Sequence, residues 1–327
     1  MTVKEKVLSC LEKNRDRYLS GEEMAEKLGV TRASVWKAVN NLREEGFRIE
    51  AVTNRGYRLT EGKDLLTGAG IGAYLNYGDP GKLYVYRETD STNTRLRLMA
   101  LEGAPHGTIA VADRQTAGRG RLGRSFVSPP GSGIYLSLLI RPETDLAGAL
   151  SVTSAAAVAV CEAVRELTGK EAGIKWVNDV YIGNKKICGI LTEAETSVEA
   201  GGLDSIVIGI GINFRSDPEA FPEDVLGRVG WIYEKEEKSV ARNELAAAVI
   251  DRTLYYADHL QEREFIEPYK EYSIILGKEI ICTRGKERFE AIALDIDNNG
   301  ALIVDTAEGR RVLSSGEITV RWKTMQS

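Results

Sequence analysis

The apolar positions at the start of the chain recur with the spacing of short helices. Residues 3–14 place valine and leucine side chains on one helical face, and residues 21–28 gather their apolar side chains in the same way. Ser20 and Glu23 form a capping-box pattern, which predicts that the serine is the N-cap of the second helix. This stretch therefore predicts two helices joined by a short loop.

A third helix is predicted over residues 32–45, with Thr31 as its N-cap and Gly46 at its end. Its predicted buried stripe consists of Val35, Val39 and Leu42, with Trp36 and Ala38 as further candidates. Residues 47–52 then alternate apolar and polar side chains as a strand does, and a turn returns the chain into 57–59. Three helices followed by a hairpin resemble a winged helix-turn-helix.

The exposed face of the third helix suits DNA. It carries short polar groups and cations, which match base edges and phosphates: Arg32, Ser34, Lys37, Asn40 and Asn41. Arg55, at the hairpin tip, would reach a phosphate or a minor groove. Residues 1–63 hold 13 Lys and Arg against 10 Asp and Glu, whereas the rest of the chain holds 30 against 38. This basic end predicts an anionic partner; the alternative is a module that contacts only proteins or has lost its DNA role.

Composition narrows the class of protein. At 327 residues, with 43% hydrophobic and 28% charged residues, the chain has the make-up of a soluble globular protein of two or three domains. No signal peptide and no apolar run long enough to span a membrane is visible. The four cysteines lack metal-ligand spacing, and the two histidines argue against a zinc site or a Ser-His-Asp triad. We expect a cytoplasmic protein with reduced thiols.

Beyond residue 63 the pattern changes to alternating strands and helices. Strands are predicted over 83–86, 109–112, 133–140 and 205–212. Residues 174–182 predict a strand and turn, with 185–193 as its hairpin partner. Helices are predicted from the Asp90–Ser91 cap to Leu101, over 147–167 and over 241–259. The second of these is apolar nearly all round, so we expect it to be the buried central helix.

The rest of the chain completes a three-domain α+β prediction. Residues 214–230 are polar, contain two prolines and predict a mobile loop. From Leu276 onward, short strands and glycine turns predict a small β-barrel. The predicted domains are a winged helix-turn-helix (1–63), a central mixed-sheet α/β domain (64–272) and an SH3-like barrel (273–327).

Residues 118–124, here called the arginine loop, alternate three arginines with glycines. Arginine forks match phosphate and carboxylate oxygens, and glycine lets the backbone approach a ligand closely. The letters also fit the Gly-x-Gly-x-x-Gly dinucleotide pattern. That pattern must open a helix, however, and the Pro-Pro-Gly run at 129–131 cannot continue one. By itself the loop fits an anion site, a solvated basic loop or an RNA-binding segment.

Five motifs in a fixed order make the sequence similar to biotin-protein ligases. They are 91–93, Gln115 with 118–124, 175–179, Lys186 with 189–191, and 209–213. With the winged helix in front, the resemblance is to the bifunctional form, a ligase joined to a biotin operon repressor. It covers residues 1–322, including 315–318. One departure is Val177, where proline is usual between tryptophan and asparagine; since valine is tolerated in a strand, we expect little consequence. Without the other motifs, residues 175–179 would be interpreted as a strand end with a turn.

The resemblance implies a reaction in two steps. The biotin carboxylate attacks the α-phosphate of ATP and releases pyrophosphate, and the resulting biotinoyl-5'-AMP acylates a lysine of a biotin carboxyl carrier domain. Because two anions meet in the first step, the site needs cations. The implied catalytic residues are Arg119, Arg121, Lys186 and Asp179, the last also as an Mg²⁺ ligand. The implied biotin-binding residues are Ser91, Thr92, Asn93, Gln115, Gly118, Arg119, Gly120, Arg121, Lys186 and Gly189. The implied ATP-binding residues are Arg121, Arg124, Phe126, Asn178, Asn213 and Trp231.

Within this scheme, uncharged residues such as Ser91 and Gln115 suit the ureido ring of biotin. Arg119 and Arg121 would bind the carboxylate and the phosphate, and Arg124 the nucleotide phosphates. The resemblance also implies operator DNA as a partner, a homodimer that forms on ligand or DNA binding, and the adenylate as corepressor.

Two rival functions remain. One is a ligand-sensing transcription factor without chemistry, against which the set of charged site residues argues. The other is a ligase of related fold for lipoate, whose apolar chain does not call for a polar ring site.

Overall fold

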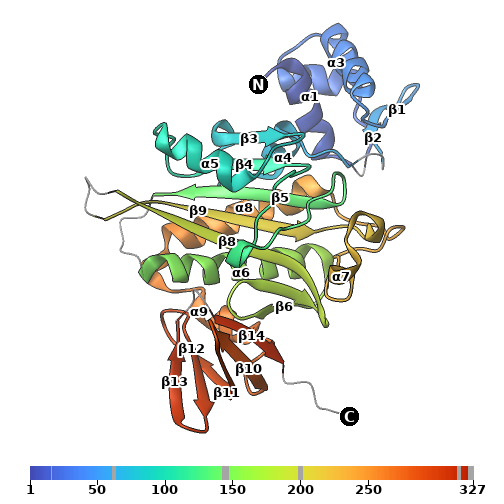
Figure 1. Ribbon diagram of the computed structural model, residues 1–327. Coiled ribbons are helices and arrows are strands. Elements are labelled where there is room, and N and C mark those ends of the chain that lie inside the picture. Colours follow the sequence, from blue (N-terminus) through green and yellow to red (C-terminus); the bar gives the residue numbers. More distant parts are fainter. Residues whose placement is uncertain (16, 61–63, 142–146, 198–201, 315–317, 323–327) are drawn as a thin grey trace.

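The computed structural model describes residues 1–15, 17–60, 64–141, 147–197, 202–314 and 318–322. In chain order it has a helical N-terminal part with a hairpin, a central seven-stranded sheet with helices and a C-terminal five-stranded sheet (Figure 1). This confirms the predicted α+β class. The domain boundaries at 63/64 and 272/273 stay predictions, and the motif residues 315–317 lie outside the described residues.

The N-terminal part is the predicted winged helix-turn-helix. Its elements are α1 (Val3–Glu12), α2 (Gly21–Leu28), α3 (Arg32–Glu44), β1 (Ile49–Val52) and β2 (Gly56–Leu59), with β1 and β2 antiparallel. Ser20 caps α2 by accepting a hydrogen bond from the backbone N of Glu23 at 3.0 Å. A capping box with both of its hydrogen bonds, formed by Thr2 and Glu5 at the start of α1, was not predicted.

The buried stripe of α3 is confirmed except at one position. Val35, Ala38, Val39 and Leu42 are buried, whereas Trp36 is 60% exposed. The inclusion of Trp36 was wrong because Ala38 completes the face that packs on α1 and α2. Position 36 lies next to Val35 in sequence, about 100° further round the helix.

The central sheet has the order β3-β4-β5-β9-β8-β7-β6, in which only β3 and β4 are parallel. Its strands are β3 (Leu83–Tyr86), β4 (Thr108–Ala112), β5 (Gly133–Ile140), β6 (Ala172–Lys175), β7 (Asp179–Ile182), β8 (Lys185–Ser197) and β9 (Gly202–Asn213). The predicted strand and turn over 174–182 are thus two strands, β6 and β7, joined by a turn. The sheet is mixed, as expected.

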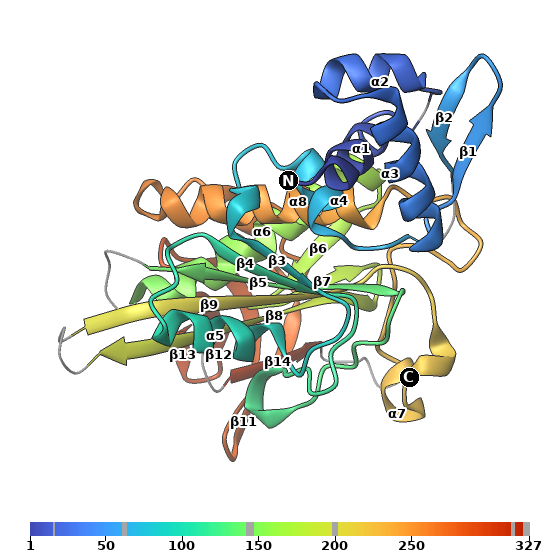
Figure 2. The ribbon, with the colours of Figure 1, turned by 90° about the horizontal axis from the view of Figure 1, so that it is seen from above.

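Helices cover both faces of this sheet (Figure 2). The helices of the central part are α4 (Gly68–Tyr74), α5 (Thr92–Leu101), α6 (Ala147–Thr168), α7 (Glu223–Leu226), α8 (Arg242–Asp258) and α9 (Ile266–Glu271). On one face α6 packs on α8 and the sheet; on the other α5 packs on β4, β5 and β9. Residues 152–164 of α6 are almost fully buried, which confirms the predicted central helix. The segment 214–230 is irregular, as predicted, apart from α7 and a 3₁₀ turn at Pro218–Ala220.

The N-terminal part is joined to the body by a buried polar contact. Glu12 of α1, 1% exposed, accepts hydrogen bonds from Asn243 of α8 at 3.1 Å and from Arg15 at 2.6 Å. Tyr74 donates to the backbone oxygen of Glu12 at 2.8 Å. A buried carboxylate needs such partners, so these bonds specify how α1 sits on the body.

The C-terminal sheet has the order β13-β12-β11-β10-β14 and is antiparallel throughout. Its strands are β10 (Glu279–Arg284), β11 (Glu287–Ile296), β12 (Leu302–Thr306), β13 (Gly309–Leu313) and β14 (Ile318–Trp322). Within the described residues β13 and β14 do not pair with each other. The predicted barrel is therefore an open sheet here, with two edges that hydrogen bonds do not close.

Candidate functional site

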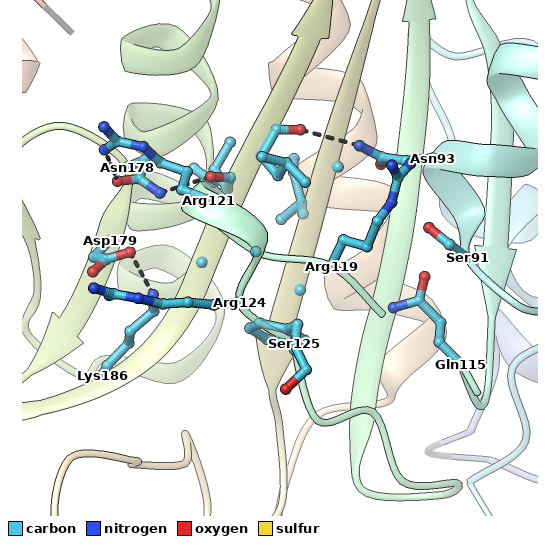
Figure 3. A pocket seen from close by; sticks show the side chains of 18 of the residues that line it. Ser91, Asn93, Gln115, Arg119, Arg121, Arg124, Ser125, Asn178, Asp179 and Lys186 are labelled. Carbon is cyan, nitrogen blue, oxygen red and sulfur yellow. Dashed lines mark hydrogen bonds and ion pairs between the residues drawn. The ribbon is translucent and has the colours of Figure 1, made fainter. Parts of the chain in front are cut away.

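One cavity of about 170 Å³ lies over β8 and β9 and beneath the arginine loop (Figure 3). It brings together thirteen of the sixteen predicted catalytic, biotin-binding and ATP-binding residues. These are Ser91, Thr92, Asn93, Gln115, Arg119, Gly120, Arg121, Arg124, Phe126, Asn178, Asp179, Lys186 and Gly189. They come from five separate stretches of the chain, so the fold, and not sequence proximity, creates the site.

One end of the cavity, here called the neutral end, is formed by the start of α5 and by Gln115 after β4. Ser91 is the N-cap of α5, which places its hydroxyl at the cavity wall. The side-chain oxygen of Gln115 accepts from the backbone N of Thr92 at 2.8 Å, and its nitrogen donates to Ser128 at 3.0 Å. Within the described residues, the Ser91 hydroxyl hydrogen and the second Gln115 amide hydrogen have no acceptor. These two donors can meet a ligand carbonyl.

Asn93, in contrast, uses its hydrogen-bonding capacity within the protein. Its Oδ1 accepts from Ser137 at 2.6 Å, and its Nδ2 donates to Glu193 at 2.8 Å and to the backbone oxygen of Leu191 at 3.3 Å. A Cβ at Gly209 would come within 2.1 Å of Asn93 Oδ1, so the glycine makes room for this side chain. Asn93 therefore shapes the neutral end more than it offers bonds to a ligand.

The opposite end, here called the cationic end, gathers Arg121, Arg124 and Lys186 around one carboxylate. Lys186 Nζ donates to Asp179 Oδ1 at 2.5 Å, and Arg121 donates to Asn178 Oδ1 at 2.9 Å. Arg124 extends toward Asp179 and Lys186 (Figure 3). Three cations beside one carboxylate favour the binding of an anion.

Burial lowers the pKa of Arg121, and the Asp179 carboxylate opposes this effect. The neighbouring charge of Arg124 lowers that pKa further. Crowding of like charge at a partly buried guanidinium means that a bound anion would relieve repulsion as well as gain attraction.

The arginine loop is a turn and not the start of a helix. It contains only a 3₁₀ turn, Arg121–Gly123, in which Leu122 has φ 57° and Gly123 φ 72°. A Cβ at Gly118 would lie 2.4 Å from the backbone oxygen of Phe126. Gly118 is thus required by the loop's own packing, and it does not line the cavity. The dinucleotide interpretation of the glycine pattern is excluded by this geometry.

The turn between β6 and β7 positions Asn178 and Asp179. Trp176 of this turn donates from Nε1 to the backbone oxygen of Gly300 at 3.0 Å, and Tyr269 donates to the oxygen of Val177 at 2.9 Å. These hydrogen bonds to α9 and to the turn before β12 therefore fix the position of the β6–β7 turn. Val177 lies in this turn and not in a strand as expected, and the Trp176–Val177 peptide bond is cis.

Glycines form the floor under Phe126. A Cβ at Gly211 would meet the Phe126 ring at 2.5 Å, and one at Gly189 would meet Lys186 Nζ at 3.0 Å. The ring also makes an edge contact with Tyr135 at a centroid distance of 6.4 Å. Side-chain-free strand positions thus leave space for an aromatic ring in the cavity.

Three predicted residues do not line the cavity: Gly118, Asn213 and Trp231. Asn213 ends β9, and its Oδ1 is buried with no partner in the described residues. Trp231 contacts Phe221 edge-on at 5.7 Å, and its Nε1 also lacks a partner there. The predicted DNA contacts lie elsewhere, on the outer face of α3 and the hairpin tip, where Arg32, Lys37, Asn41 and Arg55 are exposed and Ser34 and Asn40 are half-buried.

Several residues that hold the site residues in place were not predicted, among them Ser137, Ser128, Glu193 and Trp176. Gly209 and Gly211 belonged to a quoted motif but were assigned no role. The alternation of small and apolar residues along β5 and β9 was the available signal for the two glycines and Ser137. Nothing in the sequence marked Glu193, because its partners come from two distant segments, α5 and the arginine loop.

The described part of the chain contains no cluster of three or more His, Cys, Asp or Glu side chains placed to hold a metal ion. All four cysteines are free and buried, and burial raises the pKa of each thiol. No described helix is long and apolar enough to cross a membrane.

Three protein families match the sequence in chain order. The HTH domain family matches residues 3–58, the biotin/lipoate A/B protein ligase family residues 85–213, and the biotin protein ligase C-terminal domain residues 275–321. The bifunctional ligase/repressor BirA of Bacillus subtilis is 32% identical over 97% of this chain and 98% of its own length. BirA of Escherichia coli is 33% identical over 93% of each chain. The biotin protein ligase of Aquifex aeolicus, solved with biotin and ATP, superposes with a TM-score of 0.62 at 31% identity, over 74% of this chain and 99% of that one.

Proposed function

We propose a reaction and residue roles from one premise: this chain belongs to the family of bifunctional biotin ligase/repressors. The chain is a biotin-protein ligase, and its N-terminal domain makes it a repressor as well. For this chain we propose the reaction intermediate, the protein that accepts biotin, the roles of the site residues and the oligomeric state. The observation that carries them is the single cavity with one neutral and one cationic end.

The first step is formation of biotinoyl-5'-AMP. A carboxylate oxygen of biotin attacks the α-phosphorus of ATP, and the bond to the β-phosphate oxygen breaks as pyrophosphate leaves. Arg121 and Lys186, which meet at the cationic end, stabilise the charge that the carboxylate and phosphate bring together. Arg124 faces the same region and suits the nucleotide phosphates. Electrostatic stabilisation and positioning supply the catalysis, because no side chain forms a covalent intermediate.

The ureido ring occupies the neutral end. Ser91 and Gln115 offer the hydrogen-bond donors identified above to its carbonyl oxygen, while Thr92 and Asn93 shape the walls. The adenine lies toward Phe126, whose ring rests on strand glycines. Asn213 and Trp231, which do not line the cavity, have no role in this adenine site.

Mg²⁺ fits the cationic end only as a companion of the ATP phosphates. Asp179 supplies one carboxylate, and Lys186 already occupies one of its oxygens at 2.5 Å. Asn178 Oδ1 accepts from Arg121 at 2.9 Å. Such a donor set matches Mg²⁺, which commonly takes one or two protein carboxylates and substrate phosphates. When bound, the ion neutralises phosphate charge.

In the second step the ε-amine of a lysine on a biotin carboxyl carrier domain attacks the acyl carbon, and AMP leaves. To test this, the full chain is incubated with ATP, biotin and such a carrier domain in neutral buffer. The mass of the intact carrier domain is then measured by mass spectrometry. We expect the mass of one biotinyl group to be added, and no addition with lipoate. Biotin binding without a mass change would favour the ligand sensor, and modification by lipoate would favour the lipoate-type ligase.

On DNA, one winged helix covers one half-site, so we propose a homodimer on a two-half-site operator. Biotinoyl-5'-AMP is the corepressor, because ordering of the site by ligand leaves less entropy to lose on dimerisation. Fluorescence anisotropy of a two-half-site duplex, titrated without ligand, with biotin, and with biotin plus ATP, tests this coupling. We expect the tightest binding with both substrates, and identical curves would contradict it.

A further inference from the structure

Arg119 differs from the other two arginines of the loop in the direction of its side chain. Arg121 and Arg124 extend toward the cationic end, whereas Arg119 extends toward Asn93 (Figure 3). Its Nη2 donates to Oε2 of Glu193 at 3.0 Å and to Oγ1 of Thr94 at 3.3 Å. The first arginine of the loop is thus bonded to β8 and α5, away from the groups that meet phosphate.

Glu193 is a fixed acceptor for this arginine. Its backbone pairs with Val207 in the β8–β9 ladder, and its side chain is only 22% exposed. The same Oε2 accepts from Asn93, which Ser137 holds in turn. One carboxylate therefore ties the arginine loop and the neutral end to the centre of the sheet.

The loop depends on such side-chain bonds for its attachment to the body. Within the loop, backbone bonds join its two arms: Gly120 N donates to Arg124 O at 2.7 Å, and Phe126 N donates to Gly118 O at 2.9 Å. These bonds keep the shape of the loop but do not hold it over the cavity. The ion pair between Arg119 and Glu193 crosses from the loop to the sheet.

We propose that Arg119 and Glu193 form a latch that fastens the arginine loop over the neutral end of the cavity, with Glu193 as a positioning residue. This inference rests on the proposed function. Arg119 forms an ion pair with Glu193. The biotin carboxylate and the ATP phosphates are therefore bound by Arg121, Arg124 and Lys186. A fastened loop slows the escape of biotin and its adenylate and excludes water from both.

The test measures the dissociation rate of biotin from the full chain by chase with excess unlabelled biotin. Glu193→Gln keeps an acceptor for Asn93 and removes the charge that holds Arg119. Arg119→Gln removes the other half of the pair from an exposed loop, where it does not threaten folding. Because the pair is partly exposed, we expect each variant to release biotin about three- to tenfold faster. The double variant should be no faster than either single one.

Asp204→Asn is the matched control. Asp204 lies on β9 and pairs with Arg141 at 3.0 Å, not with the loop or with Glu193. Its release rate should equal that of the unaltered chain. Equal acceleration by Asp204→Asn would make the effect a general loss of charge and would overturn the latch.

Biotinamide, in which an uncharged carboxamide replaces the carboxylate, separates the latch from direct substrate contact. A latch predicts that Arg119→Gln accelerates the release of biotin and biotinamide by the same factor. An effect confined to biotin would show that Arg119 binds the carboxylate, and would overturn the proposal. If the unaltered chain binds no biotin, the proposed function fails along with the latch. If it binds biotin and Glu193→Gln changes nothing, only the latch fails.

Discussion

At the neutral end of the cavity the polar side chains bond mainly to one another; at the cationic end three cations lie near one carboxylate, which pairs with Lys186. Both amide hydrogens and the side-chain oxygen of Asn93 form hydrogen bonds within the protein. The side chain of Arg124, in contrast, has no hydrogen bond or ion pair among the described residues. The first end is preorganised by its own bonds, and the second concentrates positive charge that a bound anion would neutralise.

This difference separates binding from chemistry. A preorganised end recognises a neutral ring by shape and by a few unspent donors, and a substitution there should change affinity. A cationic end acts on charge that develops during the reaction, so a substitution there should change the rate. The predictions below follow this division, from the largest expected effect to the smallest.

Lys186→Met should have the largest effect. Removal of its ammonium should slow pyrophosphate release by about 10²–10³-fold at saturating substrates, because a charge-stabilising donor is lost from the transition state. Lys185→Met is the matched control: the neighbouring Lys185 bonds the backbone oxygen of Gly227 instead. A single-turnover pyrophosphate assay measures both. If Lys186→Met changed only biotin affinity, the proposed division between binding at the neutral end and chemistry at the cationic end would be wrong.

Gly209→Ala should damage the neutral end selectively. The new Cβ would overlap Oδ1 of Asn93, and the three hydrogen bonds of this side chain leave it little freedom to move. Overpacking of this kind costs about 1–3 kcal/mol, so we expect biotin affinity to fall about 10- to 100-fold while ATP affinity changes little.

Gly211→Ala, two residues along the same strand, provides the contrast. Its Cβ would meet the Phe126 ring, so nucleotide affinity should suffer more than biotin affinity. Calorimetric titration of both variants with biotin and with ATP decides the point. Equal losses for both ligands in both variants would contradict the assignment of the two ends.

Ser91→Ala should reduce biotin affinity by about five- to tenfold, through loss of one hydrogen bond of about 1 kcal/mol. It also removes the N-cap of α5, which costs about 1 kcal/mol of stability. Ser20→Ala removes a comparable N-cap in the N-terminal domain. Thermal unfolding should show similar losses for both variants, and only Ser91→Ala should bind biotin more weakly.

Arg55→Ala should have the smallest effect and lies outside the cavity. The Arg55 side chain is exposed and stacks over Tyr18 at 4.6 Å. Loss of one phosphate contact should reduce the salt dependence of DNA binding by about one ion, with carrier biotinylation unchanged. Anisotropy at several salt concentrations measures this slope. Loss of ligase activity in this variant would show that the two functions are not separable.

The sequence predicted most of the helices and strands, and thirteen of the residues that line the cavity. Helical spacing located α3, α6 and α8, and the five motifs correctly identified strands that converge. What it could not supply depends on contacts between distant residues. Trp36 was placed inward because the width of the buried stripe depends on the packing of α1 and α2. The open C-terminal sheet depends on pairing between β13 and β14, which local patterns do not encode.

Roles within the site were harder to predict than its membership. Residue type indicated that Asn93 could bind a ligand, but its bonds to Ser137 and Glu193 become visible only in three dimensions. Likewise, the glycine at 118 suggested a close ligand approach, whereas it packs against the oxygen of Phe126. Hydrogen-bond satisfaction is a property of the folded neighbourhood, which a motif does not report.

Exchange of labelled pyrophosphate into ATP tests the central claim most directly, because it reports adenylation without a carrier or DNA. The two-ended cavity predicts exchange by the full chain only when biotin is present, none with lipoate, and none for Lys186→Met with biotin. Exchange that proceeds equally with lipoate, or that survives in Lys186→Met, would contradict the account.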